Sequence, residues 1–105
     1  MKYRILQTSR AKADIYQLAA YIRWNLNNPK AASDFLQRYE REVELLGEFP
    51  FGFKETGIVY KGHTIRLKAY DTYHIFFVTE MDSKRIIIIR VLKKQQDWKR
   101  VLRKM

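Results

Sequence analysis

Three cationic side chains lie on segments of strand character in the second half of the chain, where they could bind phosphate. Arg66 and Lys68 are two residues apart, and Arg90 follows four consecutive isoleucines. Side chains two apart in a strand point to the same face, so Arg66 and Lys68 are expected to share one face of a sheet. Arginine offers phosphate a two-pronged set of donors. Arg66, Lys68 and Arg90 are therefore candidate phosphate-binding residues.

Groups for acid–base chemistry are scarce around these cations. The chain has two histidines and no cysteine. His74 is expected on the core face of the sheet, whereas His63 begins a strand and could reach the rim of the cationic face. The absence of cysteine excludes thiol catalysis and Cys-ligated zinc, and the spacing of the histidines is not that of a zinc site. We expect neither a metal nor a cofactor.

The basic residues gather toward the end of the chain. The net charge is +10 over 105 residues, and residues 84–104 contain nine Lys or Arg against Asp97 alone. Such asymmetry favours a polyanionic partner, either nucleic acid or an acidic protein, although a solvated basic helix would give the same pattern. The length predicts a single domain over residues 1–105. No apolar stretch is long enough to span a membrane, and we expect a cytoplasmic protein.

The first half of the chain predicts a strand and two amphipathic helices. A short strand is expected over residues 3–7, followed by a helix over residues 10–26 with Thr8 or Ser9 as its N-cap. Asn28 and Pro29 are typical of the start of a second helix, which the pattern ends at Gly47. The two apolar stripes predict a helical hairpin that packs on another surface.

The second half predicts that surface, an antiparallel sheet. A loop over residues 48–57 precedes strands over 63–70, 73–80 and 85–92, joined by tight turns, with 59–60 as a possible frayed strand end. Residues 95–104 predict a short basic helix. The fold class is thus α+β, with the order strand, two helices, three strands and a final helix.

Alternation along these strands predicts two faces. One face is expected to pack under the helices, and it comprises Ile65, Leu67, Ala69, His74, Phe76, Val78, Ile87, Ile89 and Val91. The other face is expected to be an open cationic groove, and it comprises Arg66, Lys68, Tyr70, Tyr73, Ile75, Phe77, Ile86, Ile88, Arg90 and Leu92. The alternative is that its cations extend from a half-buried face or pair with carboxylates such as Glu55, Glu80 or Asp97.

Several segments in this order resemble the RelE/ParE toxins of type II toxin–antitoxin systems. They are DIYQLAAYI, NPKAASDFL, LGEFP, IRLKAYDTYHIFF and IIIIRVLKKQQDW. The resemblance covers nearly the whole chain and implies a growth-inhibiting toxin that a cognate antitoxin neutralises. RelE-like members cleave mRNA on the ribosome, and ParE-like members poison DNA gyrase. A plain nucleic-acid-binding module remains a further alternative.

The resemblance also implies roles for individual residues. Arg66 and Arg90 match the strand arginines of the family, which in a metal-independent ribonuclease would stabilise phosphate charge during attack by a 2′-hydroxyl, with Lys68 beside them. The ending RVLKKQQDW is more similar to the ending RVL-H-x-x-x-D of ParE-like members, with Lys93 at the position of the histidine, and this similarity favours the ParE-like branch slightly. Contacts with nucleic acid or the target are expected from Lys61, His63, Tyr70, Lys93 and Lys94. The antitoxin is expected to cover the apolar positions Ile75, Phe77, Ile86 and Ile88.

Overall fold

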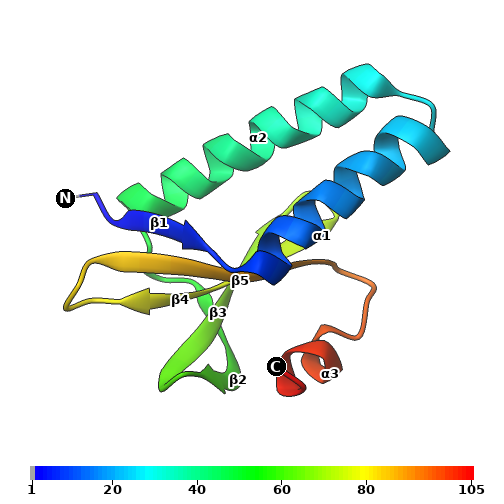
Figure 1. Cartoon of the computed structure of the whole chain (residues 1–105). Helices are drawn as coiled ribbons and strands as arrows, with labels where there is room; N and C mark the ends of the chain where they lie inside the picture. The colour runs from blue at the N-terminus through cyan, green and yellow to red at the C-terminus, as the bar shows by residue number, and fades with distance from the viewer. Residues whose placement is uncertain (1) are drawn as a thin grey trace.

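A helical hairpin and a short terminal helix cover opposite faces of a five-stranded sheet (Figure 1). The computed structural model describes residues 2–105. Its elements are β1 (Arg4–Gln7), α1 (Ser9–Ala20), the π-helical segment η1 (Tyr21–Asn25), α2 (Pro29–Glu48), β2 (Lys54–Tyr60), β3 (His63–Tyr70), β4 (Tyr73–Glu80), β5 (Arg85–Lys93) and α3 (Trp98–Arg103). The predicted α+β class is confirmed. Over residues 2–105, every helix is too short or too polar to span a bilayer.

The hairpin begins and turns at the residues that the sequence indicates. The Thr8 hydroxyl accepts a hydrogen bond from the Ala11 amide at 3.0 Å and caps α1. The helix does not remain α-helical to residue 26, because its last turn widens into η1. Asn28 caps α2 by accepting from the Ala31 amide, also at 3.0 Å. Thr8 is therefore the cap of the first helix, out of the two predicted candidates, and the predicted cap Asn28 is confirmed.

Gly47 lies inside α2 instead of ending it, because β1 passes against the helix at that point. A Cβ on Gly47 would lie 3.0 Å from Ile5 Cδ1 and 3.1 Å from the Tyr3 carbonyl oxygen. The Gly47 carbonyl accepts a hydrogen bond from the Tyr3 amide at 2.8 Å. Glycine is therefore present for close approach of two backbones and not for a left-handed helix end.

The strand order in the sheet is β1–β5–β4–β3–β2. Strands β2 to β5 form an antiparallel meander, and β1 joins β5 in parallel. The predicted loop over residues 48–57 is partly wrong, because β2 begins at Lys54 and pairs with β3. The predicted turn at residues 71–72 is confirmed by the pairing of Tyr70 with Tyr73.

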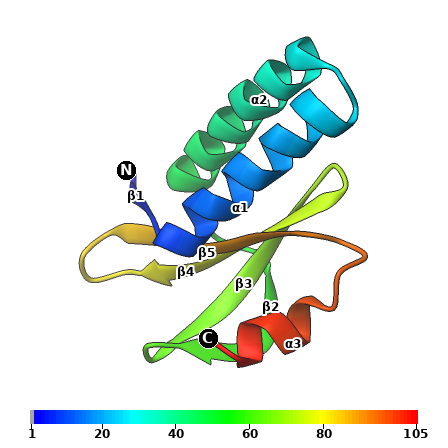
Figure 2. The ribbon, with the colours of Figure 1, turned by 45° about the vertical axis from the view of Figure 1, so that its right-hand side comes forward.

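The helical hairpin covers the face that was predicted to be an open groove. Ile75, Phe77, Ile86 and Ile88 pack in one cluster with the inner residues of α1 and α2, among them Phe35. The face predicted to lie under the hairpin instead packs against α3. Its cluster comprises Ile65, Leu67, Phe76, Val78, Ile89, Leu92 and Leu102. Figure 2 shows the hairpin and α3 on the two sides of the sheet, so the predicted assignment of the faces is wrong along most of the sheet. The end of β5 is the exception, because Val91 packs under the hairpin as predicted.

A β-bulge at Ile89 shifts the register of β5 and redirects Arg90. The pairing of Arg66 with Phe77 and of Phe77 with Ile88 is as predicted. Beyond Ile88 the ladder shifts by one residue, so Arg90 pairs with Phe76 and not with Ile75 as expected. Bulges bend the strand and re-aim its side chains, and this one separates Arg90 from the predicted cationic face.

Candidate functional site

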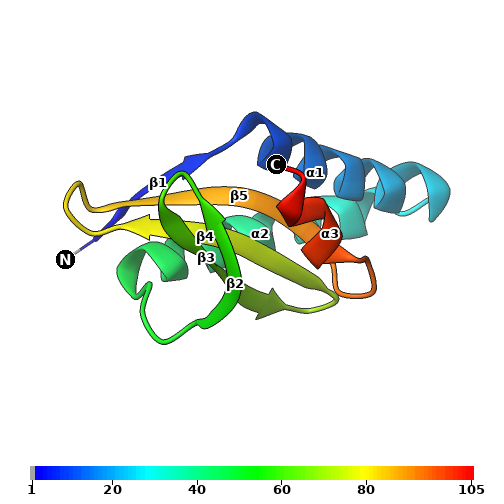
Figure 3. The same cartoon turned by 90° about the horizontal axis from the view of Figure 1, so that it is seen from below.

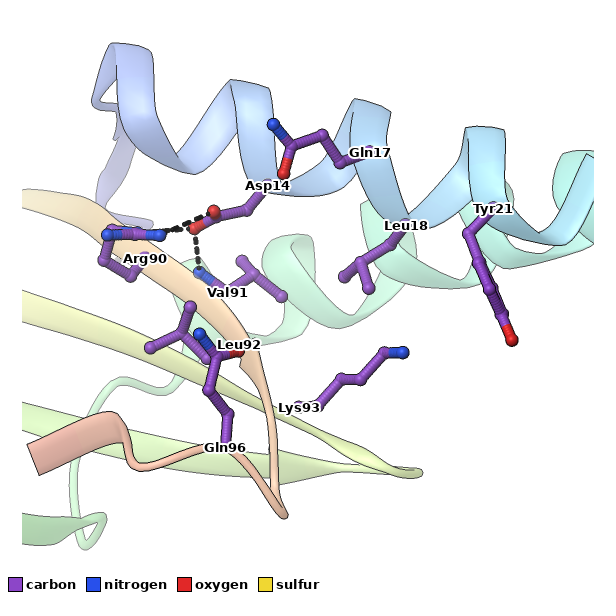
Figure 4. A pocket seen from close by; sticks show the side chains of 9 residues that line it. All are labelled: Asp14, Gln17, Leu18, Tyr21, Arg90, Val91, Leu92, Lys93 and Gln96. Atoms are coloured by element: carbon purple, nitrogen blue, oxygen red, sulfur yellow. Dashed lines mark hydrogen bonds and ion pairs between the residues drawn. The ribbon is translucent and has the colours of Figure 1, made fainter. Parts of the chain in front are cut away.

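A groove runs between α1 and the end of β5, and it contains two of the predicted site residues, Arg90 and Lys93 (Figure 4). Its volume is about 320 Å³. The groove is lined by Asp14, Gln17, Leu18, Tyr21, Arg90, Val91, Leu92, Lys93 and Gln96. Helix α1 supplies one wall, and the other wall is the end of β5 with the segment that follows it.

Asp14 binds Arg90 at the inner end of the groove. Its carboxylate accepts from Arg90 Nε at 2.8 Å, from Arg90 Nη2 at 2.9 Å and from the Val91 amide at 2.9 Å. The side chains of Arg90 and Asp14 are 13% and 9% exposed, respectively. Two-pronged arginine–carboxylate pairs are strong and fix the geometry of both groups. Arg90 is thus largely neutralised and its donors are held by α1, which leaves little of its charge for an external phosphate.

Lys93 and Tyr21 lie at the outer end of the groove. The Lys93 ammonium lies over the Tyr21 ring, 4.7 Å from its centroid. The same two residues line an adjoining pocket of about 520 Å³, to which Lys94 also contributes. Lys93 and Lys94 are exposed, so this end of the groove presents positive charge and an aromatic ring to solvent.

Arg66 and Lys68 do not converge with Arg90, contrary to the prediction. Arg66 donates to Glu55 Oε1 at 2.9 Å and to the Phe53 carbonyl at 3.0 Å. Lys68 lies 2.7 Å from Glu42 Oε2 on α2. Each of the three cations therefore has a carboxylate partner on a different element. Of the pairings weighed from the sequence, only that of Arg66 with Glu55 is present.

The remaining predicted contact residues are spread over the surface. Lys61 lies in the turn between β2 and β3, with its ammonium over Tyr60. His63 Nε2 is 3.8 Å from Glu80 Oε2. Tyr70 ends β3, where Arg38 of α2 lies over its ring at 5.7 Å. These side chains do not join the groove that contains Arg90 and Lys93.

The four apolar residues predicted to bind the antitoxin are buried. Ile75, Phe77, Ile86 and Ile88 are each 0% exposed, because the hairpin covers them. The prediction of an apolar docking face on the sheet is therefore corrected, since no partner can contact these side chains while the hairpin is in place. Exposed apolar side chains lie on the hairpin itself, where Tyr16 and Trp24 are among the most exposed.

His74 lies beneath α3, away from the groove. Its ring makes edge contacts with Phe76 and Trp98 at centroid distances of 5.7 and 6.2 Å. Its Nδ1 is buried and has no hydrogen-bond partner within residues 2–105. Desolvation by burial, and then the charges of Lys94 and Lys54, lower the pKa of His74 from its ordinary value of 6.5.

The lowered pKa of His74 predicts that acidification destabilises the protein. Because the unfolded chain takes up the proton at a higher pH than the folded chain, stability is full above about pH 6.5 and declines as pH falls from there toward the folded pKa. We expect Tm to fall between pH 7.5 and pH 5.5, as measured by circular dichroism. In His74→Gln this decline should be smaller, and an unchanged decline would show that other groups cause it.

The groove is suited to binding charge and not to acid–base chemistry. RNA cleavage by a 2′-hydroxyl needs a general base and a general acid within reach of the reacting atoms. Asp14 is occupied by three hydrogen bonds, and neither histidine lines the groove.

Sequence reasoning did not predict Asp14 or Tyr21 as residues of the groove. A signal for Asp14 was present, because it is an acidic residue within the apolar stripe of Ala11, Ile15 and Leu18.

Comparison with known families and structures finds consistent similarities. A family model described as the ParE toxin of the type II toxin–antitoxin system parDE matches residues 5–98. No curated protein sequence matches the chain.

Solved structures from toxin–antitoxin systems share the fold. A chain of the chromosomal ParDE system from P. aeruginosa superposes with a TM-score of 0.71 at 19% identity, covering 88% of this chain and 96% of that one. A chain of the RelBE2 toxin–antitoxin complex from Mycobacterium tuberculosis gives 0.61 at 15% identity, with 90% and 100% covered. A chain of the archaeal RelE–RelB complex from Pyrococcus horikoshii gives 0.54 at 17% identity, with 91% and 99% covered.

Proposed function

The chain belongs to the ParE toxin family of type II toxin–antitoxin systems, and from that premise we propose that it inhibits growth by acting on DNA gyrase and is neutralised by a cognate antitoxin. It is the toxin component of such a system. The gyrase target is favoured over ribosome-bound mRNA by the ParE assignment and by the chemistry of the groove.

One observation supports a toxin that binds its target without cleaving RNA. The three cations that a ribonuclease would need at one phosphate are tied to Asp14, Glu55 and Glu42 on separate elements. An arginine stabilises a phosphorane only if its donors are directed at the oxygen where charge develops. Cations that are already neutralised at separate places do not supply this arrangement.

The antitoxin is proposed to cover the outer surface of the hairpin. Large apolar side chains are exposed there, namely Tyr16, Tyr21, Trp24 and Leu26. Contiguous exposed apolar residues commonly mark protein-binding surfaces. A groove of about 410 Å³ between α1 and α2 adjoins Tyr16. The structures of similar fold come from ParDE and RelBE toxin–antitoxin systems, which supports a protein partner of this kind.

Pulse labelling after tightly controlled induction tests the target. If the toxin acts on gyrase, thymidine incorporation should fall first while amino-acid incorporation continues. Supercoiling by purified gyrase should also decline when the purified toxin is added. Cells induced with a vector that lacks the toxin gene serve as the control for induction.

Two other outcomes are distinguishable. Immediate loss of amino-acid incorporation, with supercoiling unaffected, would contradict the gyrase target and favour cleavage of mRNA. Normal growth with neither label reduced would contradict toxicity itself and favour a nucleic-acid-binding module.

A further inference from the structure

Helix α3 lies on the side of the sheet opposite the hairpin (Figure 3). Together with the residues that lead into it from β5, it carries a run of exposed cations. We call this run the terminal basic strip, and it comprises Lys93, Lys94, Lys99, Arg100, Arg103 and Lys104. All six residues are exposed. Six cations within twelve residues give this part of the surface a high density of positive charge.

The strip differs from Arg66, Lys68 and Arg90, each of which has a carboxylate partner. Within residues 2–105, no ion pair involves any of its six side chains. Asp97 is the one acidic residue in this segment, and its carboxylate is used as the N-cap of α3, where it accepts from the Arg100 amide. The charge of the strip is therefore not compensated by the protein.

The geometry of α3 directs this charge outward. Trp98, Val101 and Leu102 have the spacing of one helix face, and they pack onto the sheet beside Phe76. At about 100° per residue, positions 99, 100, 103 and 104 project from the opposite side of the helix. The packing of α3 thus places four cations on one solvent-facing side.

Backbone hydrogen bonds hold the segment that leads into α3. The Lys94 amide donates to the Thr72 carbonyl at 2.9 Å, and the Gln96 amide donates to the Lys93 carbonyl at 3.1 Å. The Trp98 amide donates to the Gln96 carbonyl at 2.7 Å. Lys93 and Lys94 are therefore presented on a fixed backbone next to α3, which lowers the entropy lost when they bind a partner.

We propose that the terminal basic strip binds the phosphate backbone of duplex DNA. This inference rests on the proposed gyrase target, because gyrase acts on duplex DNA and a toxin at that enzyme meets DNA as well as protein. Protein interfaces have an apolar core within a polar rim, yet the other exposed residues between Lys93 and Lys104 are the polar Gln95, Gln96 and Asp97. A row of cations without an apolar core fits a phosphate backbone better than an acidic protein.

Anisotropy of a fluorescent DNA duplex of random sequence tests the strip, with gyrase absent. The wild-type protein should bind, and the triple variant Lys99→Gln, Arg100→Gln, Arg103→Gln should bind at least about tenfold more weakly at low salt. The slope of log K against log salt should become shallower by about 3, since each phosphate contact contributes about 0.9.

A matched variant removes the same number of charges from the other side of the molecule. Arg4→Gln, Arg10→Gln, Arg41→Gln changes exposed residues of β1, α1 and α2 and should weaken DNA binding only slightly. Equal weakening in both triple variants would overturn the proposal, because net charge alone would then explain binding. Circular dichroism checks folding, and if the α3 variant unfolds, Lys93→Gln, Lys94→Gln should weaken binding instead.

Competition identifies the class of partner. Polyglutamate or duplex RNA that displaces the DNA at equal charge concentration would overturn the assignment to DNA and point to an acidic protein or to RNA. Because gyrase is absent from these measurements, their outcome is independent of the pulse-labelling result. A DNA-binding strip in a protein that stops translation first would refute the proposed target and leave the strip established.

Discussion

Asp14→Ala is expected to lower the free energy of unfolding by about 3–5 kcal/mol, because it leaves a buried charge without its partner. Arg90 would lose both hydrogen bonds of the two-pronged pair, and the Val91 amide would lose its acceptor. Exposed ion pairs cost far less to break, since water screens and solvates the freed charge. Chemical denaturation at neutral pH measures the difference.

Two further variants show whether the cost comes from the unpaired charge. Asp34→Ala breaks the exposed pair with Lys30 on α2 and should cost about 0.5 kcal/mol or less. The double variant Asp14→Leu, Arg90→Met removes both charges and should recover most of the lost stability, because apolar replacement of a buried pair is often neutral. A loss below about 1 kcal/mol in Asp14→Ala would contradict a buried, structural ion pair.

The helices were more predictable from the sequence than the arrangement of the sheet. Thr8, Asn28 and Pro29 determine the helix starts through local chemistry, and local chemistry is readable from the sequence. Residues 59–60 were predicted as a strand end, but the first part of β2 was missed because its first four residues, Lys-Glu-Thr-Gly, carry little strand propensity. That strand forms because it pairs with β3, which is a non-local cause.

The faces of the sheet were reversed for a different reason. Both faces are apolar, so alternation could separate them but could not say which one the hairpin covers. The bulge at Ile89 also has no sequence signal. Its neighbourhood is fixed by Thr8, whose amide donates to the Ile88 carbonyl at 3.0 Å and whose hydroxyl donates to the Ile89 carbonyl at 2.8 Å. These contacts join residues about 80 positions apart.

The prediction of the functional site also failed where it depended on contacts between residues that are distant in the sequence. Cations could be identified by type, but their partners came from helices whose position on the sheet was unknown. Lys68 meets Glu42 because α2 crosses the face that was expected to be open. Lys93 and Lys94 remained accessible because the chain leaves the sheet at that point. Charge density near the end of the chain was therefore a better guide to an available surface than strand alternation.

Phe77→Ala is expected to lower the free energy of unfolding by about 3–5 kcal/mol through the loss of buried ring contacts and the cavity that remains. Phe77 is 0% exposed, and its ring meets the edge of Phe53 at a centroid distance of 5.6 Å. Part of the cost depends on how far the hairpin can collapse onto the vacated space. Thermal and denaturant unfolding should agree on the loss.

Phe49→Ala is the matched control, because Phe49 is 69% exposed at the end of α2 and its truncation should cost about 1 kcal/mol or less. If Phe77→Ala were as stable as the wild-type protein, the hairpin would not be packed tightly against the face of the sheet that contains Phe77. In that case Ile75 and Ile88 would become accessible to a partner. The same comparison therefore tests the packing of the hairpin and the reason for placing the antitoxin on its outer surface.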